Sequence, residues 1–234
     1  QNISVSGTAA DIPIVLELQY GLNGYTETYD TYIYNTNPST IRGTETTIVQ
    51  DYDSETVERR SLLSFNLSSI PAGSTIVSAE LEFYVTAEGK GFDMHRMLIL
   101  WDEATVTYAS IGDRHFLADD ADAVSTVDAT WTNHDGETGF SSLEIPASTI
   151  QGWVDGTFNN YGWLMIATDN PGGDGQQLAS KENGTQERNP KLTINYYPGV
   201  ITSPQIMITS NLSAFTIEPG TPSAEQSYAV SGTN

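Results

Sequence analysis

Arginine, glutamate and tyrosine side chains stand at positions of two strand-like runs from which they could contact a sugar. Arg60 opens a run with alternating apolar residues, and Glu82 and Tyr84 lie on the polar side of a second such run. Successive side chains of a strand point to opposite faces, so these residues lie away from the apolar set. Guanidinium groups donate hydrogen bonds to sugar hydroxyls, carboxylates accept them, and aromatic rings stack on the sugar. The pattern predicts a sugar-binding sheet face, and a solvated face with cross-strand ion pairs is the alternative.

Other candidate ligand contacts lie outside these two runs. The basic candidates are Arg60, Arg96, Lys181 and Arg188, from only nine basic residues in the chain. Arg96 could instead be a buried ion-pair partner of Glu103 or Glu182. Trp131 lies between two threonines and near His134, which favours an exposed aromatic platform for a glycan.

Acidic residues form several clusters that could hold calcium. The cluster that we favour lies in an aspartate-rich stretch and consists of Asp113, Asp119, Asp120 and Asp122. Calcium takes six to eight oxygen ligands from carboxylates and carbonyl groups in flexible loops. The spacing does not match an EF-hand, and a chain with 30 acidic residues contains such clusters by chance. Calcium is therefore an expectation, and a solvated acidic loop is the alternative.

The composition argues against several classes of function. The 234 residues carry a formal net charge of -21, which disfavours nucleic acid and anionic membranes as partners. No apolar run is long enough to span a bilayer, so membrane insertion is not expected. The chain has no cysteine, no H-E-x-x-H zinc motif and no G-x-S-x-G elbow. We therefore expect a protein that is not an enzyme, with a polysaccharide lyase or hydrolase as the minor alternative.

The apolar periodicity predicts an all-β fold. Short alternating runs recur between Gly, Pro, Asn and Asp residues, which is typical of an antiparallel β-sandwich of the jelly-roll type. Residues 63, 65 and 67 and residues 79, 81, 83 and 85 are expected to line its core. One short helix is expected over residues 146–155, with Gly156 ending it.

The chain is expected to divide near Pro198. Residues 1–198 would form the sandwich, and residues 199–234 a linker with strands at 205–209 and 226–230. That tail resembles the opening of the Ig-like domains of secreted Bacteroidetes proteins. Two strands are too few for a core of their own.

Several separated motifs occur in the order found in one known family. They are RSLLSFNLSSIPAGSTIVSAELEFYV at 60–85, LQYGLNGY at 18–25, WDEATVTY at 101–108, SKE at 180–182 and PKLTINY at 190–196. Over residues 13–197 the chain resembles the DNRLRE (disaggregatase-related repeat) family. It departs from the family at Ser64, Asn66 and Tyr108, where the family usually has Arg, Asp and Trp.

The resemblance implies a module of secreted or cell-surface proteins, some of whose relatives bind polysaccharides. We therefore expect a non-catalytic module that binds a polysaccharide or matrix glycan within a larger protein, outside the cell or at its surface. The alternative is a structural subunit or stalk domain of an extracellular fibre or adhesin. In that case the C-terminal strands would be completed by a neighbouring copy through strand addition.

Overall fold

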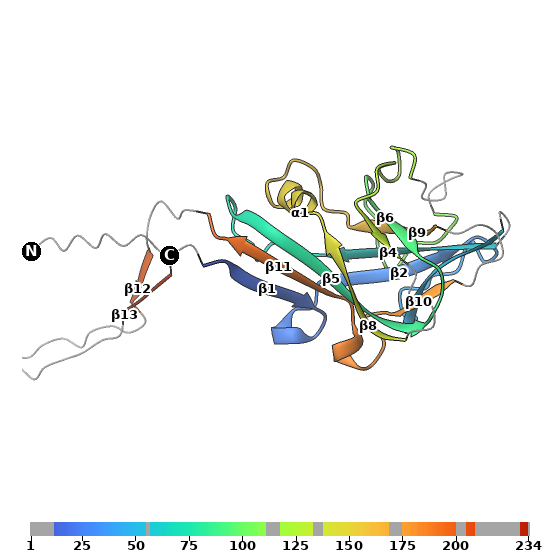
Figure 1. Cartoon of the computed structure of the whole chain (residues 1–234), viewed down its shortest axis with the longest axis horizontal. Coiled ribbons are helices and arrows are strands. Elements are labelled where there is room, and N and C mark those ends of the chain that lie inside the picture. The colour runs from blue at the N-terminus through green and yellow to red at the C-terminus, as the bar shows by residue number, and fades with distance from the viewer. Residues whose placement is uncertain are drawn as a thin grey trace, which may run out of the picture.

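The computed structural model describes residues 12–54, 57–110, 118–132, 138–168 and 175–199, together with the backbone of two C-terminal strands. Eleven antiparallel strands in this part of the chain are linked by hydrogen bonds and fold into two facing layers (Figure 1). The first layer contains β1 (Ile14–Gln19), β11 (Lys191–Tyr197), β5 (Thr75–Ala87), β8 (Gly139–Ile145) and β10 (Gln176–Ala179). The second contains β2 (Thr28–Tyr34), β4 (Val57–Phe65), β9 (Trp163–Ala167), β6 (Phe92–Arg96) and β7 (Ala129–Trp131).

Strand β3 (Thr47–Ser54) connects the two layers. Its first half, up to Gln50, pairs with β10, and its second half, from Asp51, pairs with β4. The expected all-β fold with one short helix is confirmed. That helix, α1 (Ala147–Val154), begins after Pro146 and buries Ile150 and Trp153. Two 3-10 turns also occur among the described residues, η1 (Leu22–Gly24) and η2 (Gln186–Arg188).

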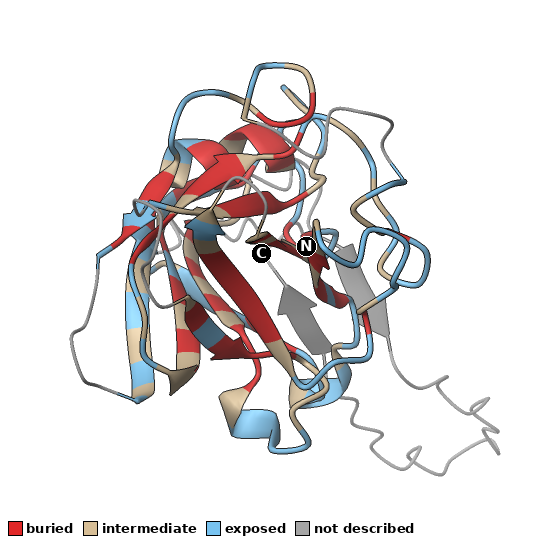
Figure 2. Ribbon diagram, turned by 90° about the vertical axis from the view of Figure 1, so that its right-hand side faces the viewer, coloured by how far each residue is buried: buried red, intermediate tan, exposed pale blue. Residues whose placement is uncertain are grey.

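The main core lies between the layers, where buried residues follow the strands (Figure 2). The predicted core residues all belong to it, namely Leu63, Phe65, Leu67, Ala79, Leu81, Phe83 and Val85. Alternation along β4 and β5 produces this arrangement, because every second side chain points inward.

A second apolar cluster covers the opposite face of β4. Leu62 of β4 and Ile33 of β2 pack there against Met97, Val106 and Ala123 from the connection between β6 and β7. This corrects the sequence-based expectation that the face of β4 bearing Arg60 is open to a ligand. A strand with apolar residues on both faces is buried on both, and Leu62 is fully buried.

The C-terminal part contains β12 (Gln205–Ile208) and β13 (Val230–Thr233), which pair in antiparallel fashion. The first of these matches the expected strand at 205–209. The second overlaps the expected strand 226–230 at residue 230, and residues 226–229 lie outside the described residues. The division at residue 198 and the Ig-like character of the tail stay predictions.

Candidate functional site

A groove of about 730 Å³ opens at the end of the sandwich where β4 runs into its following turn. Four further segments complete its walls: the start of β2, the loop that follows β6, the end of α1, and the residues just before β9. The side chains that line it include Tyr29, Leu100, Trp101, Asp102, Glu103 and Tyr161.

Hydrogen bonds between distant segments fix the walls of the groove. The indole Nε1 of Trp101 donates to the carbonyl oxygen of Tyr161 at 2.8 Å. The side-chain amide of Asn160 donates to the carbonyl oxygen of Phe65 at 2.8 Å, which ties the segment before β9 to the end of β4. The loop after β6 is therefore fixed to the strand layer beneath it.

The groove surface is mainly apolar and also carries neutral polar and acidic groups. The side chain of Leu100 is 75% exposed and that of Tyr29 is 43% exposed. Asp102 and Glu103 contribute carboxylates, whereas none of the described residues that line the groove is Lys or Arg. Such a surface can stack on the C–H face of a sugar ring and accept hydrogen bonds from its hydroxyl groups.

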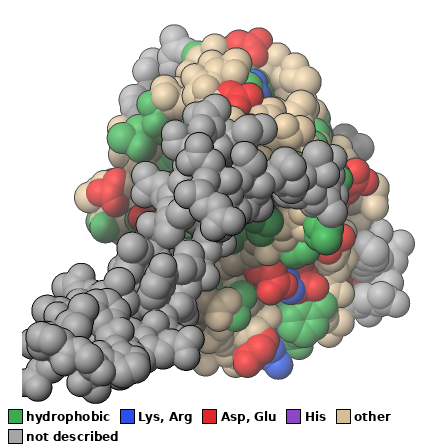
Figure 3. Space-filling view, turned by 90° about the vertical axis from the view of Figure 1, so that its left-hand side faces the viewer, with side chains coloured by type: hydrophobic (Ala, Val, Ile, Leu, Met, Phe, Trp, Pro, Cys, Tyr) green, Lys and Arg blue, Asp and Glu red, His purple; other side chains and the backbone are tan. Residues whose placement is uncertain are grey.

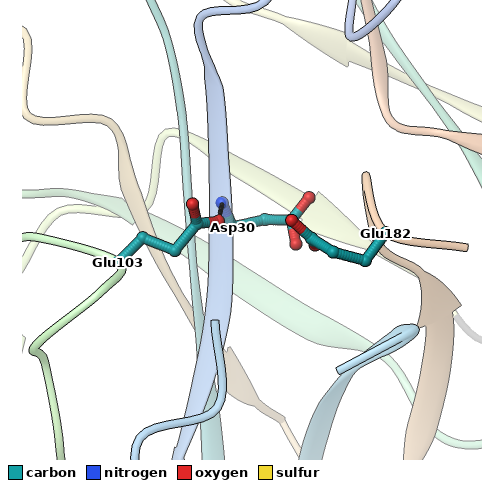
Figure 4. Close-up of side chains that lie close together, drawn as sticks. All are labelled: Asp30, Glu103 and Glu182. Carbon is teal, nitrogen blue, oxygen red and sulfur yellow. Dashed lines mark hydrogen bonds between the residues drawn. The ribbon is translucent and has the colours of Figure 1, made fainter. Parts of the chain in front are cut away.

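A buried acidic cluster adjoins the groove, and Glu103 belongs to both. Asp30 of β2, Glu103 and Glu182 point toward one another from three separate segments (Figure 4). Each offers a carboxylate oxygen, and these oxygens lie within 4.8 Å of one another. Three carboxylates at this spacing could hold a metal ion.

Lys181 supplies the positive charge in this cluster. Its ammonium group forms ion pairs with Glu103 and, at 3.0 Å, with Glu182. Its backbone N–H donates to Asp30 Oδ2 at 2.8 Å, while the N–H of Asp30 donates to Glu103 Oε1 at 2.8 Å. Tyr29 and Tyr20 lie beside the ammonium group, with ring centroids 5.8 and 5.7 Å from Nζ.

Burial controls the protonation of the cluster. Desolvation raises the pKa of Asp30 well above its usual value, and the charges of Glu182 and Glu103 add to this effect. The pKa of Glu103 is also raised, mainly by desolvation, although its hydrogen bond from Lys181 opposes the rise. Desolvation lowers the pKa of Lys181, but its bonds to Glu103 and Glu182 outweigh this and raise it overall.

Comparison with known families assigns the chain. The sequence model of carbohydrate-binding module family 96 matches residues 23–196. The chain belongs to this family. DNRLRE is a related name for it, so the resemblance found in the motifs is confirmed. The chain is thus a non-catalytic carbohydrate-binding module, as expected from the absence of catalytic motifs. No curated protein gives a match to the chain.

Three of the predicted ligand residues of the module lie together on the outer face of the first layer. The guanidinium carbon of Arg188 lies 4.2 Å from the ring centroid of Tyr84. Phe140 of β8 is 56% exposed and packs edge-on against Tyr84, with the ring centroids 5.1 Å apart. Glu82, two residues before Tyr84, forms an ion pair with Lys191 at 2.9 Å. The cross-strand ion pair weighed as the alternative is therefore present beside the aromatic pair.

Two predicted ligand residues of the module are engaged internally. The guanidinium group of Arg60 is buried and bonds to Glu58 Oε1 through Nε at 2.7 Å and through a terminal nitrogen at 2.6 Å. The ion pair of Arg96 with Glu103 or Glu182, which was the alternative to a ligand contact, is not formed. The guanidinium carbon of Arg96 lies 3.6 Å from the ring centroid of Phe158, and both glutamates instead bind Lys181.

The expected exposure of Trp131 is wrong. Its side chain is 2% exposed, because the register of β7 on β6 places it opposite Phe92 and turns it inward. The two rings stack with centroids 5.6 Å apart, and Phe83 packs edge-on against the indole. Trp131 is therefore a core residue.

The acidic turn expected to bind calcium is only partly described, since Asp113 lies outside the described residues. Asp119 Oδ1 accepts the backbone N–H groups of residues 121 and 122 at 3.0 and 3.2 Å. Asp120 accepts the backbone N–H and the hydroxyl of Ser125 at 2.7 and 2.8 Å, and Asp122 is buried. The carboxylates of Asp119 and Asp120 thus stabilise the turn itself.

Sequence reasoning missed the groove and the buried cluster. Tyr29, Leu100 and Tyr161 come from three segments that are brought together only by the fold. Asp30 carried one usable signal, because it interrupts a strand whose other residues are uncharged. A carboxylate in the interior of such a strand requires a specific partner.

Proposed function

We propose that the module binds a neutral polysaccharide in the groove, with Tyr29 as the stacking platform. The observation that supports this most is the composition of the groove, which combines apolar and aromatic surface with carboxylates. Carboxylates accept hydrogen bonds from neutral hydroxyl groups but repel uronate or sulfate groups. The chain charge of -21 acts in the same direction over a longer range.

Acidic side chains recur over the face of the molecule in Figure 3, and Lys and Arg appear only in small spots. A binding face for an acidic polysaccharide needs a cluster of basic groups. The outer face of the first layer is the second candidate surface, because Arg188, Tyr84 and the exposed Phe140 meet there. It would suit a ligand that carries some negative charge.

Matched variants separate the two surfaces. Tyr29→Ala removes the platform of the groove, and Tyr84→Ala removes the aromatic group of the outer face. Retardation in gels that contain a soluble neutral glucan, a mannan or alginate gives the affinity of each variant. We expect Tyr29→Ala to weaken binding of a neutral polymer about five- to thirtyfold, since loss of a sugar–ring contact costs roughly 1–2 kcal/mol.

The control Tyr84→Ala should leave that affinity within about a factor of two. The opposite result, in which Tyr84→Ala loses affinity and Tyr29→Ala does not, would show that the glycan binds at the outer face of the first layer. Binding of alginate alone, with no neutral polymer retarded, would contradict the proposed ligand class.

We also infer that the module works outside the cell or at its surface, attached to a larger protein. The family assignment supports this, since modules of this kind tether proteins to polysaccharides. No helix in the described part of the chain is long and apolar enough to cross a bilayer. Secretion can be checked by fractionating cells that express the full gene.

Self-association through the C-terminal strands stays a prediction of the fibre-subunit alternative. It is motivated by β12 and β13, whose backbones pair with each other as a two-stranded sheet. Analytical ultracentrifugation and electron microscopy over a range of concentrations would test it. Monomers at every concentration would remove the alternative.

Calcium binding also stays a proposal. For the turn at Asp119, Asp120 and Asp122, together with Asp113, the described contacts favour a structural role. The buried cluster of Asp30, Glu103 and Glu182 has the stronger geometry for a cation, because its three carboxylates converge.

A further inference from the structure

The cluster of Asp30, Glu103 and Glu182 contains more carboxylate than its internal partners satisfy. Asp30 is only 1% exposed, yet its Oδ1 has no hydrogen-bond partner among the described residues. The same holds for the buried Oε2 of Glu182. An unpartnered buried carboxylate oxygen is costly, so each such atom indicates a missing partner.

The remaining oxygens of the cluster are accounted for. Asp30 Oδ2 accepts the N–H of Lys181, and Glu103 Oε1 accepts the N–H of Asp30. The second oxygen of Glu103 and the first of Glu182 contact the ammonium group of Lys181. Glu103 and Glu182 therefore share the single ammonium group, Asp30 accepts only the backbone N–H of Lys181 among the described contacts, and two oxygens are left over.

We propose that Asp30, Glu103 and Glu182 bind a calcium ion, and that Lys181 is an internal cation which the ion displaces. Calcium ligands lie 2.3–2.6 Å from the ion, so two oxygens on opposite sides of it are about 5 Å apart. The ligand atoms of the cluster lie within 4.8 Å of one another, which fits this span. Magnesium holds several waters in a strict octahedron and suits a site of buried carboxylates less well.

Lys181 can leave the cluster without being stranded in an apolar environment. Its side chain lies near the rings of Tyr20 and Tyr29, which are 37% and 43% exposed. A lysine has a flexible four-carbon stem, and aromatic faces attract its ammonium group. The same side chain thus neutralises the cluster in the absence of calcium and can move toward solvent in its presence.

The site would also act on the groove, since Glu103 lies in the wall of the groove and in the cluster. An ion bound to Glu103 would fix the loop that carries Leu100, Trp101 and Asp102. This consequence rests on the proposed function. Calcium binding itself does not, and it is measured first without any glycan.

The test is calorimetric titration of the chelator-treated full chain with CaCl₂ and with MgCl₂, supported by thermal unfolding in both salts. We expect calcium to bind and to raise the melting temperature in proportion to the logarithm of its concentration, with magnesium weaker at least tenfold. Lys181→Met keeps the unbranched apolar stem and removes the competing charge, so it should bind calcium at least tenfold more tightly than the parent chain.

Asp30→Asn should abolish binding, and Glu182→Gln provides the same test should Asp30→Asn fail to fold. Asp119→Asn is the matched acidic control, and it should bind calcium like the parent chain. Absence of a calcium signal in both the parent chain and Lys181→Met would overturn the proposal. Loss of binding in Asp119→Asn, with binding retained in Glu182→Gln, would place the ion in the other acidic turn.

Discussion

Substitution of Arg60 should unfold the module more readily without changing its affinity for a glycan. Arg60 and Glu58 form an ion pair whose side chains are 9% and 11% exposed, with nitrogen–oxygen distances of 2.6 and 2.7 Å. Removing one partner of a buried pair leaves the other charge without compensation and costs about 3–5 kcal/mol. This is a large part of the total stability of a domain, which is on the order of 5–15 kcal/mol.

A double variant distinguishes the cost of an unpaired buried charge from the loss of either side chain by itself. Arg60→Met and Glu58→Gln should each cost about 3 kcal/mol or more, whereas the pair of substitutions together should cost less than either alone, because no unpaired charge remains. Urea titration gives the free energy of unfolding of all four proteins. Glycan binding is then compared in the absence of urea, at a temperature at which each protein is folded. A cost below about 1 kcal/mol for Arg60→Met would show that the pair is solvated. Weakened binding in the folded single variant would show that Arg60 contacts the ligand.

Three further predictions concern the core, one turn and the effect of pH. Trp131→Ala should lower the free energy of unfolding by about 3–5 kcal/mol, as measured by urea titration. A loss as small as that of a substitution at an exposed position would contradict the burial of Trp131. Gly162→Ala should cost about 2 kcal/mol or more in the same assay, because φ is +75° and a Cβ would collide with the carbonyl oxygen of Leu63. Desolvation raises the pKa of Asp128, although its hydrogen bond from Trp163 opposes the rise, so the folded state binds more protons than the unfolded state above about pH 4. The contribution of Asp128 to stability should therefore fall as the pH rises through its folded pKa. Unfolding of the parent chain and of Asp128→Asn across pH 4–8 should show this, and a difference that is constant with pH would contradict it.

The core could be predicted from the sequence because it depends on alternation alone. The inward faces of β4 and β5 were assigned correctly from Leu63, Phe65, Leu81 and Phe83. The opposite face of β4 was assigned wrongly, because alternation shows which residues share a face but not what covers that face. Leu62 in that face was the available signal for burial on both sides.

Short strands and long-range contacts account for the other differences. β7 has only three residues, so no alternation indicated which way Trp131 points. The cluster joins Asp30 to Lys181 across 151 positions of sequence, and Glu103 comes from a third segment. Residues that converge from separate loops leave no spacing pattern, so a site of this kind becomes visible only when the layers are assembled.

The distribution of positive charge favours a neutral ligand over an acidic one. Arg59 pairs with Asp51, Arg60 with Glu58, Lys181 with Glu103 and Lys191 with Glu82. Arg42 also pairs with Glu45, so five of the nine basic residues form ion pairs with carboxylates within the described part of the chain. The chain as a whole still carries 21 more acidic than basic residues. A polyanion approaching the groove would meet the exposed carboxylate of Asp102, whereas Glu103 is paired with Lys181, and none of the described residues that line the groove is basic. Hydroxyl groups meet no such barrier, so the ion pairs that stabilise the sandwich also restrict what its groove can bind.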